Sequence, residues 1–182
     1  MTNHTNTEKT TYTITAYSEN QIGLLNRITI IFTRRRVNIE TLTVSPSAIE
    51  GIHKFTIVVH DTKARVQQVV SQIEKLVEVL RAFYHTDNEI VWQEIALYKV
   101  PTESLLNDDN FEAVIRQHNA RILEVKPEYT ILEKTGHEEE TQELFELLKQ
   151  FGIRQFTRSG RVAVTKLRKE LLSTYLKEVD KT

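Results

Sequence analysis

The chain has no cysteine among its 182 residues, which excludes disulfides and thiolate metal sites and fits a reducing compartment. It has no apolar run approaching the roughly 20 residues that a membrane-spanning helix needs. It also lacks an excess of charge, because 24 Lys and Arg stand against 25 Asp and Glu, a formal net charge of -1. A balance this close to neutral gives no electrostatic footprint for nucleic acid or for an anionic membrane.

The first ten residues, MTNHTNTEKT, lack the apolar segment of a signal peptide. We therefore expect residues 1–10 to be a disordered tail and the protein to be cytoplasmic. The composition of the whole chain, with 40% apolar and 27% charged residues, is typical of a globular protein that can bury a core.

The sequence also lacks the residue patterns that are typical of metal sites and of catalytic sites. The six histidines show no spacing that is typical of a metal site, so metal binding is not expected. Ser159 precedes a glycine, but no nucleophile elbow surrounds it and no His or Asp is placed to activate it. Without an acid, a base and a nucleophile, the chain is not predicted to be an enzyme.

Residues 11–85 alternate between the periods of a strand and of a helix. Apolar residues alternate from Tyr12 to Ala16, as in a strand with one buried face, and the period from Leu24 to Arg36 is that of a helix. The pattern continues with two strands, a helix and a last strand, over residues 37–45, 55–59, 66–77 and 80–84. This βαββαβ order predicts a ferredoxin-like unit, with two helices on one face of a four-stranded sheet.

A second unit of the same kind is predicted for residues 93–182, after a linker over residues 86–92. Its elements are a strand, a helix, two strands, a helix and further strand material, over 92–100, 105–118, 121–133, 141–151, 156 and 162–165, with a final helix over 169–179. The predicted fold class is therefore α+β, with two ferredoxin-like domains. Because helices on one side leave an apolar face or edge of the sheet uncovered, we expect at least a dimer.

The turn between the first strand and the first helix has features of an amino-acid site. A glycine-containing turn into a helix aims free backbone N–H groups at one point, where an α-carboxylate is stabilised. Gly23 has no Cβ and lets a ligand approach the backbone, and the Asn20 amide can bond to an ammonium or to a carboxylate. The alternative is that these two residues form only a turn and a helix start.

The segment Ser18–Ile28, SENQIGLLNRI, resembles the opening turn and helix of an ACT domain, and more closely the small subunit of acetohydroxyacid (acetolactate) synthase. Three further stretches carry the same resemblance, which runs from about Tyr12 to Val164: VNIETLTV at 37–44, QIEKLVEVL at 72–80 and RSG at 158–160. The N-I-E-T-L-T-V stretch is quite specific, whereas many ACT domains carry something similar to E-N-x-x-G. The resemblance places an ACT effector-binding domain at residues 11–85.

The resemblance implies a non-catalytic regulatory subunit of the enzyme that condenses two 2-oxo acids at the start of valine, leucine and isoleucine synthesis. Such a subunit activates the catalytic subunit, forms a homodimer through its ACT domain and confers feedback inhibition by a branched-chain amino acid, usually valine. Thiamine diphosphate, Mg²⁺ and FAD would belong to the catalytic partner, with no cofactor in this chain. The alternative function is a free-standing amino-acid-sensing ACT protein that regulates another enzyme or transcription, although no helix-turn-helix is visible.

The resemblance also implies the effector site. In the family, the matching asparagine and glycine line the pocket, and an asparagine that matches Asn38 reaches it from the neighbouring protomer. The residues carried over are Asn20, Gly23, Leu24, Leu25, Asn38 and Ile39. Leu24 is bulkier than the small residue that the family often has after the glycine. If its side chain faces the pocket, the effector is smaller than valine or sensitivity is lost.

Two other motifs have an ordinary structural explanation beside a functional one. Arg34–Arg36 could form a phosphate or nucleic-acid patch, but we interpret it as a solvated helix end whose charge suits the helix dipole. Arg158–Gly160 is interpreted as a tight turn between strands, with a contact to the catalytic subunit as the alternative.

Overall fold

The structure is a computed structural model that describes residues 8–107 and 109–166. The predicted tail lies mostly outside these residues, and the predicted helix over 169–179 lies entirely outside them. The described chain forms two compact units, of which the second consists of Gln93–Gly160. The first unit takes the chain up to Trp92 and again from Arg161.

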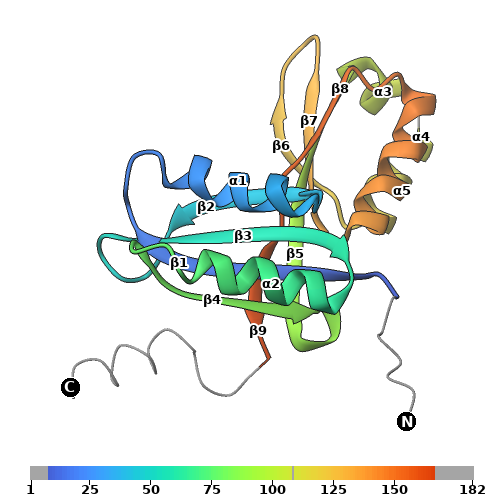
Figure 1. Ribbon diagram of the computed structural model, residues 1–182. Coiled ribbons are helices and arrows are strands. Elements are labelled where there is room, and N and C mark those ends of the chain that lie inside the picture. The colour runs from blue at the N-terminus through green and yellow to red at the C-terminus, as the bar shows by residue number, and fades with distance from the viewer. Residues whose placement is uncertain (1–7, 108, 167–182) are drawn as a thin grey trace. The chain divides into compact units, whose positions relative to one another are not determined.

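The first unit contains a four-stranded antiparallel sheet with strand order β2-β3-β1-β4. Both of its helices lie on one face of the sheet, α1 towards β2 and α2 towards β4 (Figure 1). Its elements are β1 (Thr10–Glu19), α1 (Leu24–Arg35), β2 (Thr41–Pro46), β3 (Ile52–Asp61), α2 (Lys63–Ile73) and β4 (Val79–Thr86). The order is the predicted βαββαβ.

The core of this unit lies between the sheet and the two helices. Ile14 on β1 is fully buried and lies opposite Ile57 of β3 and Tyr84 of β4. From α1 the buried residues are Leu24, Ile28 and Phe32, and from α2 they are Val66, Val69, Val70 and Ile73. Each fully buried aliphatic side chain contributes about 1.5–3 kcal/mol of transfer free energy, so this interface holds both helices to the sheet.

The helix-free face of the same sheet is contacted by the chain that follows β4. A 3-10 turn, η1 (Asp87–Glu89), leads into β5 (Ile90–Val100), which pairs with the last described strand, β9 (Val162–Thr165). Ile90, Trp92 and Ala163 form a small buried cluster of their own. Residues 86–92 were predicted as a linker, whereas the structure places them in the end of β4, in η1 and in the first part of β5.

Arg161 attaches β9 to the first unit. Its guanidinium stacks over the Trp92 ring at 3.6 Å, and its Nη1 bonds to Asp87 Oδ1 at 2.7 Å and to Thr13 Oγ1 at 3.4 Å. Lys54 Nζ donates to the carbonyl oxygen of Ala163 at 2.7 Å. The strand over 162–165 was expected within the second unit. It pairs with β5 in the five-stranded sheet, while the division into compact units groups it with the first.

The second unit repeats the topology of the first. Its antiparallel strand order, β6-β7-β5-β8, places the second, third, first and fourth strands side by side as in the first unit. After β5 come α3 (Thr102–Asn107), α4 (Asp109–Gln117), β6 (Arg121–Val125), β7 (Thr130–Gly136), α5 (Glu138–Leu148), η2 (Lys149–Phe151) and β8 (Gln155–Arg158). The predicted α+β fold with two ferredoxin-like units is confirmed.

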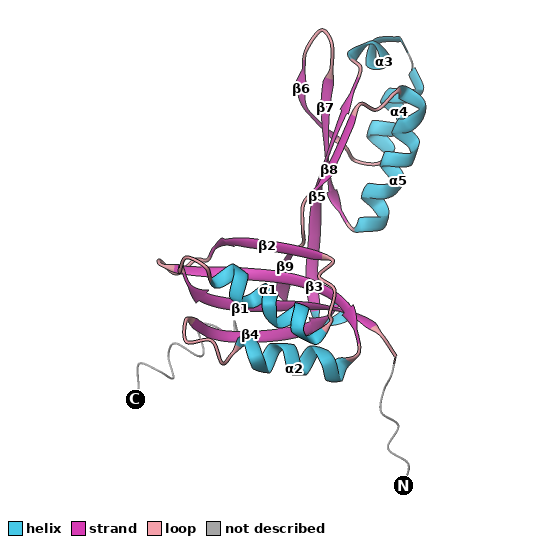
Figure 2. Ribbon diagram, turned by 45° about the horizontal axis from the view of Figure 1, so that its top comes forward, coloured by secondary structure: helices cyan, strands magenta, loops and turns pink. Residues whose placement is uncertain are grey.

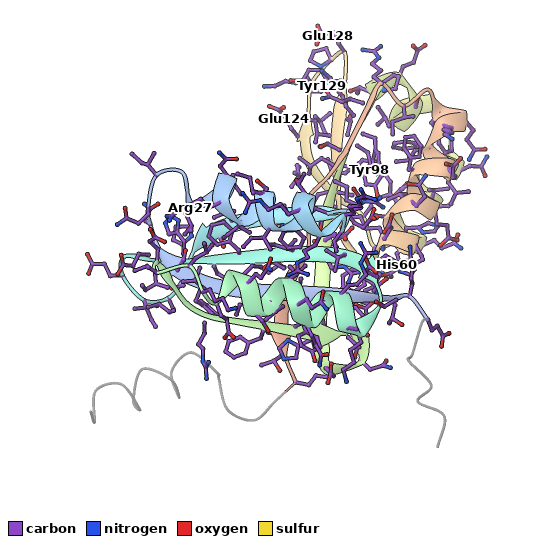
Figure 3. The ribbon with its side chains drawn as sticks, in the orientation of Figure 1. Arg27, His60, Tyr98, Glu124, Glu128 and Tyr129 are labelled. Atoms are coloured by element: carbon purple, nitrogen blue, oxygen red, sulfur yellow. The ribbon has the colours of Figure 1, made fainter. Side chains whose placement is uncertain are left out.

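Tyr98 is the largest fully buried side chain of the second unit (Figure 3). Its hydroxyl donates to the carbonyl oxygen of Thr141 at 2.7 Å, and burial raises the pKa of that hydroxyl well above its usual value. Phe111, Leu132, Leu144 and Leu148 complete the centre of this core. Figure 2 shows α3, α4 and α5 on one face of their strands.

Among the helices of the described residues, none is both long enough and apolar enough to cross a membrane.

Candidate functional site

The turn predicted as an effector site joins β1 to α1 and is held by backbone hydrogen bonds. The N–H of Asn20 donates to the carbonyl oxygen of Gly51 at 3.2 Å, which fastens the turn to the β2–β3 loop. The N–H of Leu24 donates to the carbonyl oxygen of Gln21 at 3.3 Å. The turn is therefore shaped by the backbone, which leaves the Asn20 side chain exposed to solvent.

Gly23 is the N-cap of α1 and has a left-handed backbone, with φ of 83°. A Cβ built at this position would meet no atom within 4 Å, so the space beside the backbone is open. No side chain caps the helix, and its first turn contains no acidic residue. The N–H of Leu24 is bonded to Gln21, but in the described part of the chain those of Leu25 and Asn26 have no such partner, and they can bind an anion at the positive end of the helix dipole.

An ion pair lies one helical turn beyond Gly23. Arg27 on α1, labelled in Figure 3, places its Nη2 at 2.5 Å from Glu78 Oε1. The backbone carbonyl of Glu78 accepts from the N–H of Glu19 at 3.0 Å, so this residue contacts both ends of the turn. The hydrogen bond from Arg27 holds the pKa of the Glu78 carboxyl below its usual value. Sequence reasoning did not single out either residue, although Glu78 lies in the 72–80 stretch that resembles the family.

Leu24 and Leu25 project from α1 in different directions, about 100° apart, and differ in burial. The Leu24 side chain is 1% exposed and belongs to the hydrophobic core, with Ile28 and Phe32 on the same helical face. Only its backbone can face a ligand, and the bulk of its side chain takes no space from a surface pocket. Leu25 is 46% exposed, beside the fully exposed Ile22.

Asn38 and Ile39 lie beyond the other end of α1. Asn38 is exposed and donates through its Nδ2 to Glu40 Oε1 at 2.9 Å, whereas Ile39 is half-buried against the core. The 12 residues of α1 separate Asn20 from Asn38 by a helix of about 18 Å. Within one chain, then, the structure brings Asn20, Gly23 and Leu25 together and leaves Asn38 and Ile39 apart from them.

The two edges of the first sheet differ. At the β4 edge, the N–H of Ala82 donates to Glu74 Oε1 at 3.3 Å and that of Thr86 donates to Glu89 Oε2 at 2.7 Å. These carboxylates occupy donors that another strand would need. In the described part of the chain no side chain bonds to β2 in this way, and Val44 on β2 is 40% exposed. The β2 edge is therefore the more suitable one for pairing with a second chain.

Arg158 and Ser159 are bound within the second unit. Arg158 forms ion pairs with Glu94 at 3.4 Å and with Glu138 at 2.9 Å. Ser159 Oγ accepts from the N–H of Ile95 at 2.9 Å, and its own N–H donates back to the Ile95 carbonyl at 2.8 Å. Arg158 and Ser159 therefore both have structural roles at the end of β8 and in the connection that follows it.

Comparison with known protein families matches both units. Residues 14–81 match the family described as AHAS small subunit-like ACT domain, and residues 93–167 match the family described as small subunit of acetolactate synthase.

Individual relatives carry the same name. The chain is 34% identical over 151 residues to the acetolactate synthase small subunit of Bacillus subtilis, covering 82% of this chain and 87% of that protein. It is also 34% identical over 151 residues to the one from Aquifex aeolicus, covering 83% and 79%. The crystal structure of the acetolactate synthase small subunit from Thermotoga maritima superposes with a TM-score of 0.78 at 25% identity, over 87% of this chain and 99% of that one.

Proposed function

The chain belongs to the family of acetolactate synthase small subunits, and from this premise we propose that it is the non-catalytic regulatory subunit of that enzyme. In this proposal it activates the catalytic subunit and inhibits it when a branched-chain amino acid, valine first of all, binds to the ACT domain. Thiamine diphosphate, Mg²⁺ and FAD bind to the catalytic subunit.

The observation that carries the proposal is the open, uncapped N-terminus of α1 beside the exposed Asn20. The free N–H groups and the helix dipole suit the α-carboxylate of an amino acid. The Asn20 amide oxygen can accept from the ligand's ammonium group. Ile22 and Leu25 offer exposed apolar surface to an aliphatic side chain at the same place.

One chain supplies only half of such a site. The turn lies on an open surface, and Asn38 is about one helix length away from it. A two-fold dimer that pairs β2 with β2 in an antiparallel sense places the two copies of α1 side by side and antiparallel, because α1 lies on the β2 side of the sheet (Figure 1). The start of each α1 then faces the end of the other, and Asn20 of one protomer shares a ligand with the partner's Asn38.

This arrangement links binding to the packing of the two protomers. An effector held by both chains stabilises one arrangement of the dimer over others, and allosteric coupling of this kind is typically about 1–3 kcal/mol. A change of this size modulates a catalytic partner about 5- to 150-fold without any chemistry in the regulatory chain.

The test is calorimetric titration of the purified dimer with valine, leucine and isoleucine. We expect Asn20→Ala and Asn38→Ala each to abolish saturable binding, and Asn88→Ala, an exposed asparagine on η1, to leave it unchanged. A heterodimer of the two inactive variants regains one intact site, because each chain supplies the group that the other lacks.

The outcomes separate the possibilities. Restored binding in the heterodimer establishes a shared site, whereas a heterodimer that does not bind would place the site within one chain or elsewhere. Activation of the catalytic subunit is measured in parallel with the wild-type chain. Amino-acid binding without any effect on that enzyme would overturn the regulatory assignment and indicate a free-standing sensor.

A further inference from the structure

The end of α1, with its three arginines, also receives a cation from α2. Arg65 on α2 donates from Nη2 to the carbonyl oxygens of Arg35 at 2.6 Å and of Arg36 at 2.8 Å. Arg65 is itself held by the buried carboxylate of Asp61 at 3.0 Å. Arg34 and Arg35 do lie in the last turn of α1, as the sequence interpretation of a dipole-matched helix end requires, and with Arg65 bonded to the end carbonyls their side chains can also contact a partner.

Arg35 is held in place by neutral groups. Its Nη1 donates to Gln68 Oε1 at 3.1 Å, and its Nε lies 3.2 Å from the oxygen of Gln72 once that amide is oriented as its neighbours require. Within residues 8–107 and 109–166, neither Arg34 nor Arg35 nor the exposed Lys75 forms an ion pair with a carboxylate. Three cations, one of them fixed, thus face solvent without internal counter-charges.

These cations surround two adjoining grooves between α1 and α2. One groove, of about 530 Å³, has Ile31 and Leu76 in its lining, and the other, of about 420 Å³, continues along α2 to Ala64. Both are lined by Arg35, Gln72 and Lys75. The lining residues of α2 recur at intervals of three and four from Ala64 to Gln72, so the combined groove follows one face of that helix for about 12 Å, and Lys75 and Leu76 line it just beyond the end of the helix.

We propose that this groove, named here the α1–α2 groove, binds an acidic helical segment of the catalytic subunit. Carboxylates of that segment pair with Arg34, Arg35 and Lys75, and its aliphatic side chains contact Ile31 and Leu76. An apolar floor under a cationic rim suits an amphipathic acidic helix, which lays one face into a groove of this kind. A free phosphate or a nucleic-acid backbone would make no use of the floor. The identity of the partner, though not the groove, rests on the proposed function.

The experiment compares two double charge reversals in the full-length chain. Arg34→Glu with Lys75→Glu changes the groove, and Lys9→Glu with Lys63→Glu changes the net charge equally at exposed sites outside it. The affinity for the purified catalytic subunit is measured at about 50 and about 300 mM salt, since screening weakens such pairs. We expect the groove variant to bind about tenfold or more weakly at low salt, with a smaller difference at high salt. The control pair should bind within about twofold of wild type.

Each outcome bears on one part of the proposal. Groove and control variants that bind equally well would overturn the docking groove, while wild-type binding would still uphold the regulatory function. A wild-type chain that neither binds nor activates the catalytic subunit would overturn both. A groove variant that loses its dimer mass in sedimentation would assign the groove to a second copy of this chain instead. Arg34→Gln with Lys75→Gln, which removes charge without reversing it, should give an intermediate loss of affinity if the contact is electrostatic.

Discussion

Gly23 fixes the shape of the turn between β1 and α1 through its backbone alone. Its φ of 83° lies in the left-handed region, which costs a residue with a Cβ about 1–2 kcal/mol. We expect Gly23→Ala to lower the free energy of unfolding of the first unit by that amount, measured by urea titration. The variant should also bind the effector more weakly, because the new Cβ projects into the open space beside the helix start.

Gly152 provides the control for this prediction. Its φ is 75°, and a Cβ there would come no closer than 3.8 Å to Pro101 in the second unit. Gly152→Ala should therefore lose a similar amount of stability and keep full effector binding. Equal effects of both variants on binding would contradict a ligand contact at Gly23.

The ion pair of Arg27 with Glu78 predicts an acid-sensitive turn. The hydrogen bond from Arg27 lowers the folded-state pKa of Glu78 below its ordinary value. A carboxyl with a lowered folded pKa stabilises the fold above its unfolded pKa, and this contribution is lost as the pH falls through the folded pKa. We expect wild type to lose more stability than Glu78→Gln between pH 6 and pH 3, in denaturant unfolding at each pH.

The test depends on the difference in stability between wild type and Glu78→Gln at each pH. Glu89, Glu133 and Glu146 also have lowered pKa values and contribute to the same acid limb in both. Parallel pH profiles for wild type and Glu78→Gln would show that the pair contributes nothing to folding.

At the scale of elements, the helices and most strands could be predicted because each has a clear period. The sequence pattern groups Leu25 with Ile28 and Phe32 on one face of the helix, whereas the structure buries Leu24 with them and leaves Leu25 46% exposed. Intervals of three and of four residues are both helical, so periodicity alone did not decide between the two leucines. The compact unit to which β9 belongs could not be predicted in this way. Val162–Thr165 alternates like any strand, and its place depends on the contacts of Arg161 with Asp87 and Thr13, which are 74 and 148 residues away.

In the candidate site, too, residues that depend on local sequence could be predicted, and contacts between distant positions could not. Asn20 and Gly23 could be predicted because a strand, a turn and a helix start follow one another within a few residues. The Arg27–Glu78 pair joins positions 51 residues apart, and no local pattern indicates it. Edge capping by Glu74 and Glu89 likewise requires knowledge of which strand lies at the edge of the sheet.

Arg158 and Arg161 lie three residues apart in different units, which makes them a matched pair for a test. Arg161→Met removes the Trp92 stacking and the bond to Asp87, and we expect it to destabilise the first unit by roughly 1–3 kcal/mol. Hydrogen exchange followed by mass spectrometry should then become faster in β9 and in β1.

Arg158→Met should act on the other unit, because its ion pairs reach Glu94 and Glu138. Faster exchange is expected in β8 and at the start of α5, with β1 unchanged. If Arg161→Met accelerated exchange only in the second unit, β9 would belong there, as the order of elements along the chain suggests.

At the scale of the whole molecule, the two units have the same topology, and each has an exposed edge strand that pairs with only one neighbour. These strands are β2 in the first unit and β6 in the second. Each carries an exposed valine, Val44 at 40% and Val125 at 52%. Only pairing at the β2 edge can form the shared site, because it brings the start of α1 in one copy next to the end of α1 in the other.

Lysine on an edge strand opposes pairing with another strand. Replacing each valine in turn by lysine therefore tests which of the two edges forms the dimer. We expect Val44→Lys to weaken the dimer about tenfold or more, because a two-fold axis brings the new charge close to its own copy and to a desolvated interface. Sedimentation across a range of concentrations measures this, and effector binding should fall in step with the dimer fraction. Val125→Lys should leave both the mass and the binding unchanged. The reverse result, with dissociation by Val125→Lys alone, would move the dimer to the second unit and leave Asn20 and Asn38 without a common ligand.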